Sequence, residues 1–457
     1  MMFTIREIMK ATGGRLIRGS AKKQVRGVST DSRTIKAGDL FVALVGEHFD
    51  GHRFAREVVQ AGAAGILVSR ENVDAPADVP LILVADTTRA FGRLAAFHRS
   101  RFKIPVVAIT GSAGKTSTKE LTAAVLGTKY KVLFNKGTEN NHVGVPRTLL
   151  QMTRRHQAAV IEVGTNHPGE IAWLGEIVRP TVAVFTNIGA SHLAGFGDLE
   201  GVFAEKSSLL DHLAPKGTVI LNADDPFLAR IVKMKRPQKI LTYGTQKKAG
   251  VHVQKIVMDG AGFRVTLKDK KVFFLPSLAQ GNVMNALAAL SCARILKVPT
   301  AKAVKALASS VPPKGRMVVH DLKGVLLIDD TYNANPVSCR NALKALSLIP
   351  RRGKAFFVVG DMLELGPEAR RWHEEVGEEA ARAGVDQVIS VGDLARHIGT
   401  RARRRKKSLL ARHVAGKDEA LRILFADVRP GDVVLVKGSR GMRMEEIVEK
   451  VLQLGKG

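Results

Sequence analysis

The chain has 457 residues, more than one hydrophobic core normally organises, so we expect about two to four domains. Hydrophobic residues make up 45% and charged residues 25% of the sequence, which excludes a disordered chain. The formal net charge of +29 favours anionic partners: nucleic acid, a membrane surface or phosphorylated substrates. No apolar run reaches the about 18 residues of a membrane span, and no hydrophobic signal segment is seen.

Two cysteines, Cys292 and Cys339, are too few for a disulfide framework and fit a reducing compartment. We expect both to be small buried apolar residues and the protein to be cytoplasmic. The densest basic run, 401–407, is predicted to be a solvated loop. Aromatic residues are only 5% of the chain and do not interleave with the basic clusters, so we expect no nucleic-acid partner.

The first block, residues 1–85, mixes short helices and strands and is expected to form a small mixed α/β domain. Its predicted elements are helices at 4–12 and 54–61 and strands at 39–44 and 65–68. A helical segment at 88–101 then leads into the second block.

In the second block, 86–312, apolar strand signals alternate with helical patterns. The strand signals lie at 106–109, 158–163, 182–186 and 218–221. Such alternation predicts a parallel sheet with helices on both faces. A stretch richer in strand signals, 239–275, interrupts the pattern.

The linker at 312–315 contains two prolines and a glycine, and a third block, 313–457, follows it. Strands are predicted at 325–329, 355–360, 387–391 and 433–437, with helices from Pro336, Pro367, Asp418 and Gly441. This pattern predicts a Rossmann-like domain, although the dinucleotide-binding motif G-x-G-x-x-G is absent. The expected fold class is therefore α/β with three domains.

A glycine-rich turn lies between the strand at 106–109 and a helical pattern. The turn reads Gly111, Ser112, Ala113, Gly114, Lys115, Thr116 and Ser117. Backbone N–H groups and a helix N-terminus favour phosphate oxygens, Lys115 can reach the β/γ-phosphates, and the Thr116 hydroxyl can ligate Mg²⁺. The common phosphate-loop spacing would place glycine at Ile109, so the turn matches a shorter variant. We therefore expect the central domain to be a parallel-sheet ATPase domain of the P-loop type.

Further chemistry-bearing side chains follow neighbouring strands. Glu162 ends a strand at the carboxyl edge, where open parallel sheets bind ligands, and is predicted to ligate Mg²⁺ rather than to be a solvated strand end. His192 lies past the next strand and suits a metal, a phosphate or a structural role. Lys206, on a helix predicted at 200–213, is by itself an ordinary surface lysine.

Polar motifs also lie in loops. Asn140 and Asn141 suit hydrogen bonds to sugar or amide groups, although by composition alone they are turn residues. Three motifs of the third block, at 328–336, 360–366 and 436–441, each follow a strand. The carboxyl ends of parallel strands meet at one edge, so we expect these motifs to face the phosphate loop across a domain cleft.

Together these motifs resemble the Mur ligase family, the ATP-dependent amide ligases of peptidoglycan precursor synthesis, over the whole chain. In that family the phosphate loop reads Gly-x-x-Gly-Lys-Thr/Ser, as at 111–116. The stretches 29–33 and 38–44 are similar to the uridine-nucleotide-binding domain of two branches of the family.

Three stretches, 140–146, 330–336 and 360–366, resemble one branch in particular. That branch joins D-alanyl-D-alanine to UDP-N-acetylmuramoyl-tripeptide. The Asp-Asn-Pro-Arg signature of the diaminopimelate-adding branch is absent.

The resemblance implies ATP and two Mg²⁺ ions, with Lys115 on the β/γ-phosphates. Thr116 and Glu162 would bind the first Mg²⁺, and His192 would help to bind the second. Lys206 stands where the family has a lysine carbamylated by CO₂, in a sequence context that is looser than the usual one.

The resemblance also implies a nucleotide site built from two domains. Asn282 and Asn285 would lie near the adenine, and Arg316 near the ribose or phosphates. Asp330 and Asn333 would complete the site from the third domain. The UDP-linked substrate would be held by Ser29, Asp31, Ser32, Arg33, Asn140 and Asn141. One departure is Gly281, which replaces the family histidine near the adenine.

The implied reaction is ATP-dependent amide formation through an acyl phosphate, by a monomer. Four alternatives stay open: the diaminopimelate-adding branch, a folylpolyglutamate synthase, a nucleic-acid-stimulated P-loop ATPase and a non-catalytic UDP-sugar-binding protein.

Overall fold

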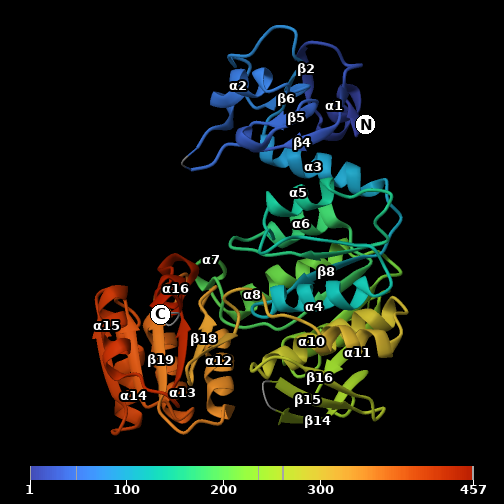
Figure 1. Cartoon of the computed structure of the whole chain (residues 1–457). Coiled ribbons are helices and arrows are strands. Elements are labelled where there is room, and N and C mark those ends of the chain that lie inside the picture. Colours follow the sequence, from blue (N-terminus) through green and yellow to red (C-terminus); the bar gives the residue numbers. More distant parts are fainter. Residues whose placement is uncertain (1, 48, 235, 260–261, 455–457) are drawn as a thin grey trace.

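The computed structural model describes residues 2–47, 49–234, 236–259 and 262–454, and three α/β units follow one another along the chain (Figure 1). Their sheets have five, nine and six strands, and a separate two-stranded ribbon pairs β1 with β3. The α/β architecture expected from alternating strand and helix signals is confirmed. The limits placed at residues 85 and 312 stay a prediction.

The N-terminal unit has a sheet of order β2-β7-β6-β5-β4, which is parallel except for β2. Its elements are β1 (Phe3–Thr4), α1 (Ile5–Thr12), β2 (Arg15–Arg18), β3 (Gln24–Val25), β4 (Gly27–Ser29), η1 (Ser32–Thr34), β5 (Asp39–Val42), η2 (Gly51–Phe54), α2 (Ala55–Gln60), β6 (Gly65–Val68) and β7 (Leu81–Leu83). Thr4 caps the start of helix α1, because its hydroxyl accepts a hydrogen bond from the Glu7 N–H and the Glu7 carboxylate accepts one from the Thr4 N–H. Gly13, with φ of 72°, ends the helix.

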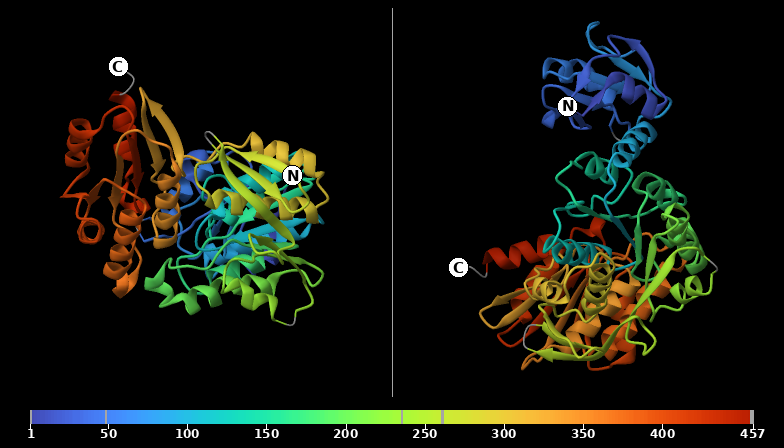
Figure 2. Two further views of the ribbon diagram at one scale, coloured as in Figure 1. Left: turned by 90° about the horizontal axis from the view of Figure 1, so that it is seen from below. Right: turned by 90° about the vertical axis from the view of Figure 1, so that its right-hand side faces the viewer.

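Helix α3 (Thr87–Ser100) connects this unit to the central one (Figure 2). The nine central strands have the order β16-β15-β14-β13-β12-β11-β8-β10-β9. The strands are β8 (Val106–Thr110), β9 (Val132–Phe134), β10 (Ala158–Glu162), β11 (Val182–Phe185), β12 (Thr218–Asn222), β13 (Lys239–Gly244), β14 (Val251–Asp259), β15 (Gly262–Leu267) and β16 (Val272–Leu275). Strands β8 to β14 pair in parallel, and β15 and β16 extend the sheet with antiparallel pairing, within the strand-rich stretch 239–275.

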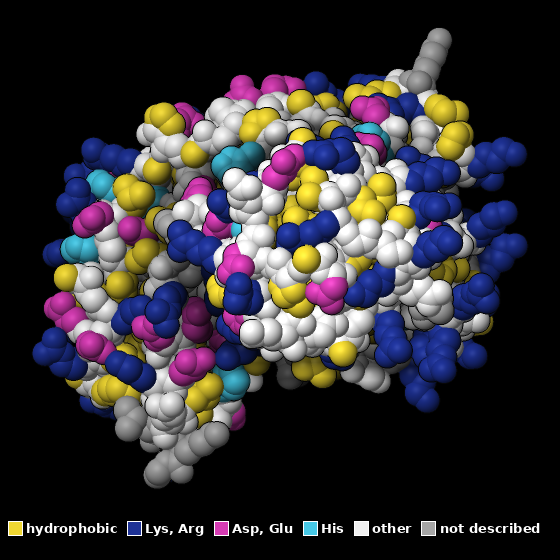
Figure 3. All heavy atoms as spheres, turned by 90° about the horizontal axis from the view of Figure 1, so that it is seen from above, with side chains coloured by type: hydrophobic (Ala, Val, Ile, Leu, Met, Phe, Trp, Pro, Cys, Tyr) yellow, Lys and Arg dark blue, Asp and Glu magenta, His cyan; other side chains and the backbone are white. Residues whose placement is uncertain are grey.

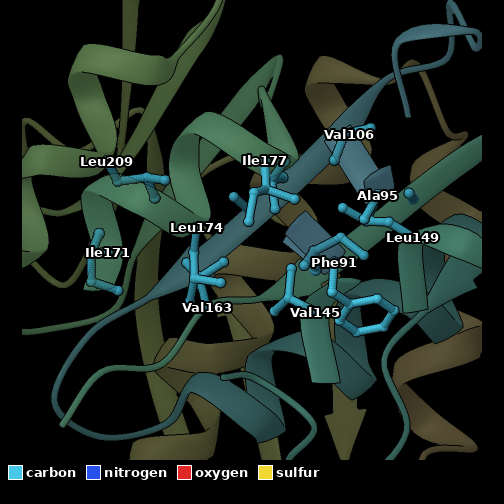
Figure 4. Close-up of a cluster of buried hydrophobic side chains, with 14 of the residues drawn as sticks. Phe91, Ala95, Val106, Val145, Leu149, Val163, Ile171, Leu174, Ile177 and Leu209 are labelled. Carbon is cyan, nitrogen blue, oxygen red and sulfur yellow. The ribbon is translucent and has the colours of Figure 1, made fainter. Parts of the chain in front are cut away.

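Helices cover both faces of the central sheet, as predicted. They are α4 (Lys115–Gly127), α5 (Gly144–Leu150), α6 (Glu170–Val178), α7 (Leu193–Phe196), α8 (Leu199–Ser207), η3 (Ser208–His212), α9 (Leu228–Val232), α10 (Gly281–Ile295) and α11 (Thr300–Ala308). Because side chains alternate along a strand, Val106 packs with α3, α5 and α6 (Figure 4), whereas Val107 packs with α4 and α10 on the opposite face. Burial of each large apolar side chain in this way contributes about 1.5–3 kcal/mol to the stability of the fold.

The C-terminal unit has a sheet of order β17-β18-β22-β19-β20-β21, parallel except for β17. Its elements are β17 (Val318–Leu322), β18 (Val325–Asp330), α12 (Pro336–Leu348), β19 (Ala355–Gly360), η4 (Gly366–Glu368), α13 (Ala369–Arg382), β20 (Gln387–Val391), α14 (Arg396–Arg405), β21 (Leu410–Val414), α15 (Lys417–Asp427), β22 (Val433–Lys437), η5 (Arg440–Met442) and α16 (Glu445–Leu454). Helices α12 to α14 cover one face, and α15 and α16 cover the other.

Two predictions of local structure are wrong. The helix predicted at 200–213 divides into α8 and η3. The basic run 401–407, predicted to be a loop, lies mostly in α14, which ends at Arg405. The helix forms because Ile398 and Ala402, four residues apart, are buried against the sheet. Among the residues described, no helix is long and apolar enough to cross a membrane.

Candidate active site between the central and C-terminal units

A cavity of about 590 Å³ lies between the carboxyl edges of the central and C-terminal sheets; we call it the cleft. The cleft is lined by most of the residues that the sequence assigned to a nucleotide and metal site. These are Ser112, Ala113, Gly114, Lys115, Thr116, Ser117, Glu162, His192, Asn282, Asn285, Arg316, Asp330 and Asn333. Asn140, which was predicted to bind the UDP-linked substrate, also lines the cleft. Gly111, Asn141, Lys206 and the predicted residues of the N-terminal unit do not line it.

The phosphate loop connects β8 to α4, and two of its glycines are required by the geometry. Gly111 and Gly114 have φ of 144° and 81°, conformations that side chains other than glycine rarely adopt. A Cβ at Gly111 would lie 2.0 Å from the Thr186 hydroxyl oxygen, and one at Gly114 would lie 2.5 Å from Asn285 Oδ1. The loop is further anchored because Ala113 N–H donates to Asn187 Oδ1 at 2.9 Å. The backbone therefore has the close-packed turn that a phosphate cradle needs.

Lys115 is the first residue of α4, so its amine lies at the positive end of the helix. Its Nζ donates to the Gly111 carbonyl at 2.8 Å. Desolvation lowers the pKa of Lys115, the nearby Glu162 carboxylate opposes this, and Arg316 adds to the lowering. An anionic ligand in the cleft would relieve the repulsion between these two cations.

Glu162 lies at the end of β10 and is 1% exposed. Its Oε1 accepts a hydrogen bond from Asn140 Nδ2 at 2.7 Å, whereas its Oε2 is buried without a hydrogen-bond partner. A buried unpaired carboxylate oxygen is costly unless a ligand completes it. Thr116 lies nearby in the cleft, with its hydroxyl accepting from Arg316 Nη2 at 2.9 Å.

These donors fit a hard divalent cation such as Mg²⁺, which prefers carboxylate, hydroxyl and phosphate oxygens. Among the described residues no group of three or more His, Cys, Asp or Glu side chains is placed to hold a metal. A cation bound here would therefore need Thr116, Glu162 and oxygens of the nucleotide itself.

His192 follows β11 and lies where the two units touch. Its Nδ1 is hydrogen-bonded to the carboxylate of Glu364, from the C-terminal motif 360–366, and this contact lowers the pKa of Glu364. The Ala194 N–H donates to the Glu364 carbonyl at 3.3 Å. His192 is thus held across the boundary between the units rather than free on the rim.

Lys206 is not the surface lysine that its sequence context allows. It lies on α8, is 1% exposed, and desolvation together with repulsion from Lys115 lowers its pKa to about 7. The neighbouring Glu205 supports the backbone beside it, because its carboxylate accepts from the Gly169 and Ile171 N–H groups at 2.7 and 2.8 Å.

The C-terminal edge of the cleft is held by a buried ion pair. Lys437 Nζ donates to Asp330 Oδ2 at 2.6 Å and to the Asn333 carbonyl at 3.0 Å. Burial raises the pKa of Asp330, and the Lys437 ammonium opposes this. Arg316, just after the linker, stacks on the ring of Tyr332 at 4.3 Å. The third unit therefore brings Arg316 against the phosphate loop.

Asn282 and Asn285, on α10, close the cleft on a third side. Asn285 Nδ2 donates to Asn282 Oδ1, and Asn285 Oδ1 accepts from the Thr118 hydroxyl at 3.1 Å. Gly281, at the start of the same helix, has room for a side chain, since an added Cβ would lie 3.5 Å from its nearest neighbour, an atom of Asn341.

The predicted uridine-site residues of the N-terminal unit lie apart from the cleft, around η1. The Asp31 carboxylate accepts from the Arg33 side chain, which lowers the pKa of Asp31 to about 2. The intervening Thr30 accepts a hydrogen bond from Arg147 of α5 at 3.2 Å. Arg147 also lines a surface hollow shared with Asn141. Ser29 and Ser32 lie in the same segment, so the N-terminal loop borders the central unit.

Sequence reasoning missed a network behind Glu162. Lys119 is fully buried on α4, and its Nζ donates to the carbonyls of Asn135 and Gly137, both at 2.7 Å. Asn135 in turn hydrogen-bonds both the N–H and the carbonyl of Glu162. The available signal was the i, i+4 spacing of Lys119 from Lys115, which places them on adjacent turns of one helix face.

The site combines a glycine-rich phosphate loop, a buried carboxylate with an unpaired oxygen and a facing α/β unit. This combination is typical of enzymes that use a nucleoside triphosphate. Family models identify the rest. The Mur ligase middle domain matches residues 109–293, the Mur ligase glutamate ligase domain matches 315–440, and the Mur ligase family catalytic domain matches 24–99. The chain belongs to the Mur ligase family.

Characterised relatives match over nearly the whole chain. A UDP-N-acetylmuramoyl-tripeptide--D-alanyl-D-alanine ligase from Escherichia coli is 39% identical, over 94% of each chain. The protein of that name from Bacillus subtilis is 34% identical, over 98% of each. Among solved structures, MurF from Acinetobacter baumannii is 33% identical with a TM-score of 0.90 and covers 99% of both chains. MurF from Thermotoga maritima in complex with ADP gives 30% and 0.85, covering 94% of this chain and 98% of its own.

Proposed function

We propose that the protein is an ATP-dependent ligase that joins D-alanyl-D-alanine to the terminal carboxylate of UDP-N-acetylmuramoyl-tripeptide. The two relatives from Bacillus subtilis and Escherichia coli carry this activity in their names and match along 98% and 94% of their length. The observation that carries the proposal within the structure is the cleft, where a phosphate loop and an unsatisfied carboxylate face a second α/β unit.

A carboxylate is a poor acyl donor because it lacks a leaving group, and ATP supplies one. The tripeptide carboxylate attacks the γ-phosphorus, which forms an acyl phosphate and releases ADP. The amine of D-alanyl-D-alanine then attacks the acyl carbon, and phosphate leaves with the bonding electrons while the amine loses a proton. The first step brings two anions together, and in the second negative charge develops on the acyl oxygen and the leaving phosphate, so cations must neutralise the charge in both.

In this scheme Lys115 and the loop N–H groups bind the phosphates. Arg316 lies within reach of the loop and is held by its stacking on Tyr332, so it supplies a second cation from the C-terminal unit. Asn282 and Asn285 border the adenine end of the cleft. Asp330 and Asn333 are positioned by Lys437 and complete the nucleotide site from the opposite sheet.

Mg²⁺ ions, when bound, would neutralise phosphate charge and polarise the γ-phosphate. Thr116 and Glu162 would hold the first ion, and His192 would contribute to a second. Asn140 fixes Glu162 Oε1, so Oε2 is the oxygen that stays available for metal. Closer approach of the two units around bound substrates would keep water from the acyl phosphate.

Lys206 suits carbamylation, because only a neutral amine reacts with CO₂ and a pKa of about 7 keeps a large neutral fraction near neutral pH. The amine nitrogen attacks the carbon of CO₂ and releases a proton, which converts a buried cation into an anion beside Lys115. This change of sign would remove the repulsion that lowers the pKa of Lys206.

The UDP moiety is assigned to the N-terminal segment that contains Ser29, Asp31, Ser32 and Arg33. Asn141, in the hollow that borders this segment, and Asn140, in the cleft, would lie along the path between the two sites. We further assign the protein to the cytoplasm, where free cysteines persist; Cys292 and Cys339 are both buried and unbridged. We assign it as a monomer, a state that its hydrodynamic radius would test.

The deciding measurement is ADP release with Mg²⁺, ATP and UDP-N-acetylmuramoyl-tripeptide, in the presence and absence of D-alanyl-D-alanine. Release that requires the dipeptide, with UDP-N-acetylmuramoyl-pentapeptide as product, is the expected result. Release that needs a single amino acid instead would assign the chain to another ligase branch. Release stimulated only by nucleic acid would overturn the proposal while leaving the phosphate loop in place.

A further inference from the structure

The net charge of +29 has no full explanation in the cleft. Lys and Arg side chains are spread widely over the surface seen from above (Figure 3), so charge alone marks no site. One hollow of about 520 Å³ differs because most of the side chains around it are basic. We call it the basic groove, and its lining residues are Ser390, Arg396, Gly399, Thr400, Arg403, Arg404, Lys407, Ala411, Arg412 and His413.

The groove lies between α14 and the edge strand β21 of the C-terminal sheet. Figure 1 places α14 on the outer side of this unit, whereas α12 and β18 are on the side toward the central unit. Arg396, Thr400 and Arg403 recur at helical spacing and share one face of α14. The floor is made of small residues: a Cβ added at Gly399 would lie 3.4 Å from the Ala411 Cβ. Larger side chains there would fill the hollow.

The charges of the groove are largely unpaired. None of its lining residues is acidic. Arg401, which does not line the groove, forms an ion pair with Glu378 of α13. Arg412, which does line it, forms an ion pair with Asp427 at 3.4 Å. Within the described part of the chain, Arg403 and Arg404 form no ion pair. The same holds for the remaining cations, Arg396 and Lys407. The helix therefore places the acid-paired Arg401 toward α13, whereas unpaired Arg396, Arg403 and Arg404 lie around the groove.

We infer that the basic groove binds a compact polyphosphate anion, separately from the cleft. Several guanidinium groups around one hollow match adjacent phosphates, each of which accepts paired hydrogen bonds from an arginine. The volume is that of a small-molecule site. The hydroxyl of Thr400 and the imidazole of His413 add polar groups to it. No Phe, Tyr or Trp lines the groove, so it lacks the stacking platform that single-stranded nucleic acid uses.

The test is calorimetric titration of the full-length protein with inorganic tripolyphosphate. Four proteins are compared: the wild type, R403Q/R404Q, K302Q/K305Q and Lys115→Ala. The second double variant removes the same charge from two exposed lysines of α11, which line no described pocket. Lys115→Ala disables the phosphate loop, so binding that survives it is binding outside the cleft. Ligase turnover of R403Q/R404Q should equal that of the wild type.

We expect Lys115→Ala to keep a tripolyphosphate site that the wild type and K302Q/K305Q also have, and we expect that site to bind about tenfold or more weakly in R403Q/R404Q. Equal binding by the two double variants would overturn the proposal, because only the overall charge would then matter. Loss of all binding in Lys115→Ala would overturn it too. Tighter binding of a single-stranded RNA oligonucleotide than of tripolyphosphate, lost in R403Q/R404Q, would replace the compact anion with nucleic acid. Failure of the ligase assay leaves each of these outcomes unchanged.

Discussion

The carboxyl edges of the central and C-terminal sheets face each other across the cleft, yet their charged groups are satisfied to different degrees. On the central edge, Glu162 keeps a buried oxygen without a partner and Lys115 lies beside a second cation. On the C-terminal edge, Asp330 is paired with Lys437, and Asp361 accepts from the N–H groups of Leu394 and Ala395. The central edge is electrostatically incomplete, which suits a site that a charged ligand completes. The C-terminal edge is a scaffold that holds its own shape.

The largest expected effect concerns the scaffold edge. Lys437→Met leaves Asp330 buried and uncompensated, so it should destabilise the C-terminal unit by about 3–5 kcal/mol in urea unfolding. The double variant K437M/D330N removes both charges and should recover most of that loss. A single variant as stable as the wild type would contradict the assignment of this edge as a scaffold.

On the incomplete edge, removal of a charge should harm turnover and not stability. Lys115→Ala should lower turnover on the order of 10²–10³-fold, as loss of a charge-stabilising donor does elsewhere, while the melting temperature changes little. Lys216→Ala, an exposed lysine beyond the cleft, is the matched control and should be fully active. Near-normal turnover in Lys115→Ala would remove the phosphate loop from the reaction.

Lys119→Met tests the network behind Glu162. It removes the two bonds to the carbonyls of Asn135 and Gly137 and should raise the Mg²⁺ concentration for half-maximal rate about tenfold. Glu120→Gln keeps those bonds and breaks only the ion pair between Glu120 and Lys119, so its Mg²⁺ dependence should match the wild type. Equal Mg²⁺ dependence in both variants would mean that Lys119 only supports the fold.

Lys206, whose pKa is lowered by burial and by Lys115 of the central edge, gives a test by pH. The folded protein holds this amine neutral above about pH 7, whereas the unfolded chain protonates it up to its usual pKa of 10.5. Between about pH 7 and pH 10.5, unfolding therefore takes up a proton. The buried lysine lowers the free energy of unfolding, and this loss becomes smaller as the pH rises through that interval. In CO₂-free buffer, Lys206→Met should exceed the wild type in stability most at pH 7, and the excess should fall by about 1.4 kcal/mol per pH unit above that. A gap independent of pH would contradict the lowered pKa.

The smallest effect is expected at Gly281, which has room for a side chain. Both Gly281→His and Gly281→Ala should add about 0.4–1 kcal/mol of stability by restricting the unfolded chain. Only the histidine offers a ring to the adenine, so only Gly281→His should lower the KM for ATP, by roughly severalfold. Equal KM values in the two variants would place the adenine elsewhere.

Much of the fold was predictable because its signals are local. Apolar runs at 106–109 and 158–163 gave strands, and the glycine-rich turn gave the start of a helix. The helix α14 was missed because charged residues dominate its composition. The apolar residues that pack it against the sheet, Ile398 and Ala402, are only two. The edge strands β17 and β21 were missed for a related reason: both are largely exposed, so they lack the apolar run of a central strand.

The sequence by itself determined the element order, the parallel sheets and the residue types that meet at a sheet edge, since these follow from periodicity and from where strands end. The tertiary structure decided which of those residues touch. Arg316 reaches Thr116 across 200 residues of chain, and Lys437 reaches Asp330 across 107. It also decided the burial that lowers the pKa of Lys206. Such contacts and desolvation depend on how distant elements pack, and no local pattern records that packing.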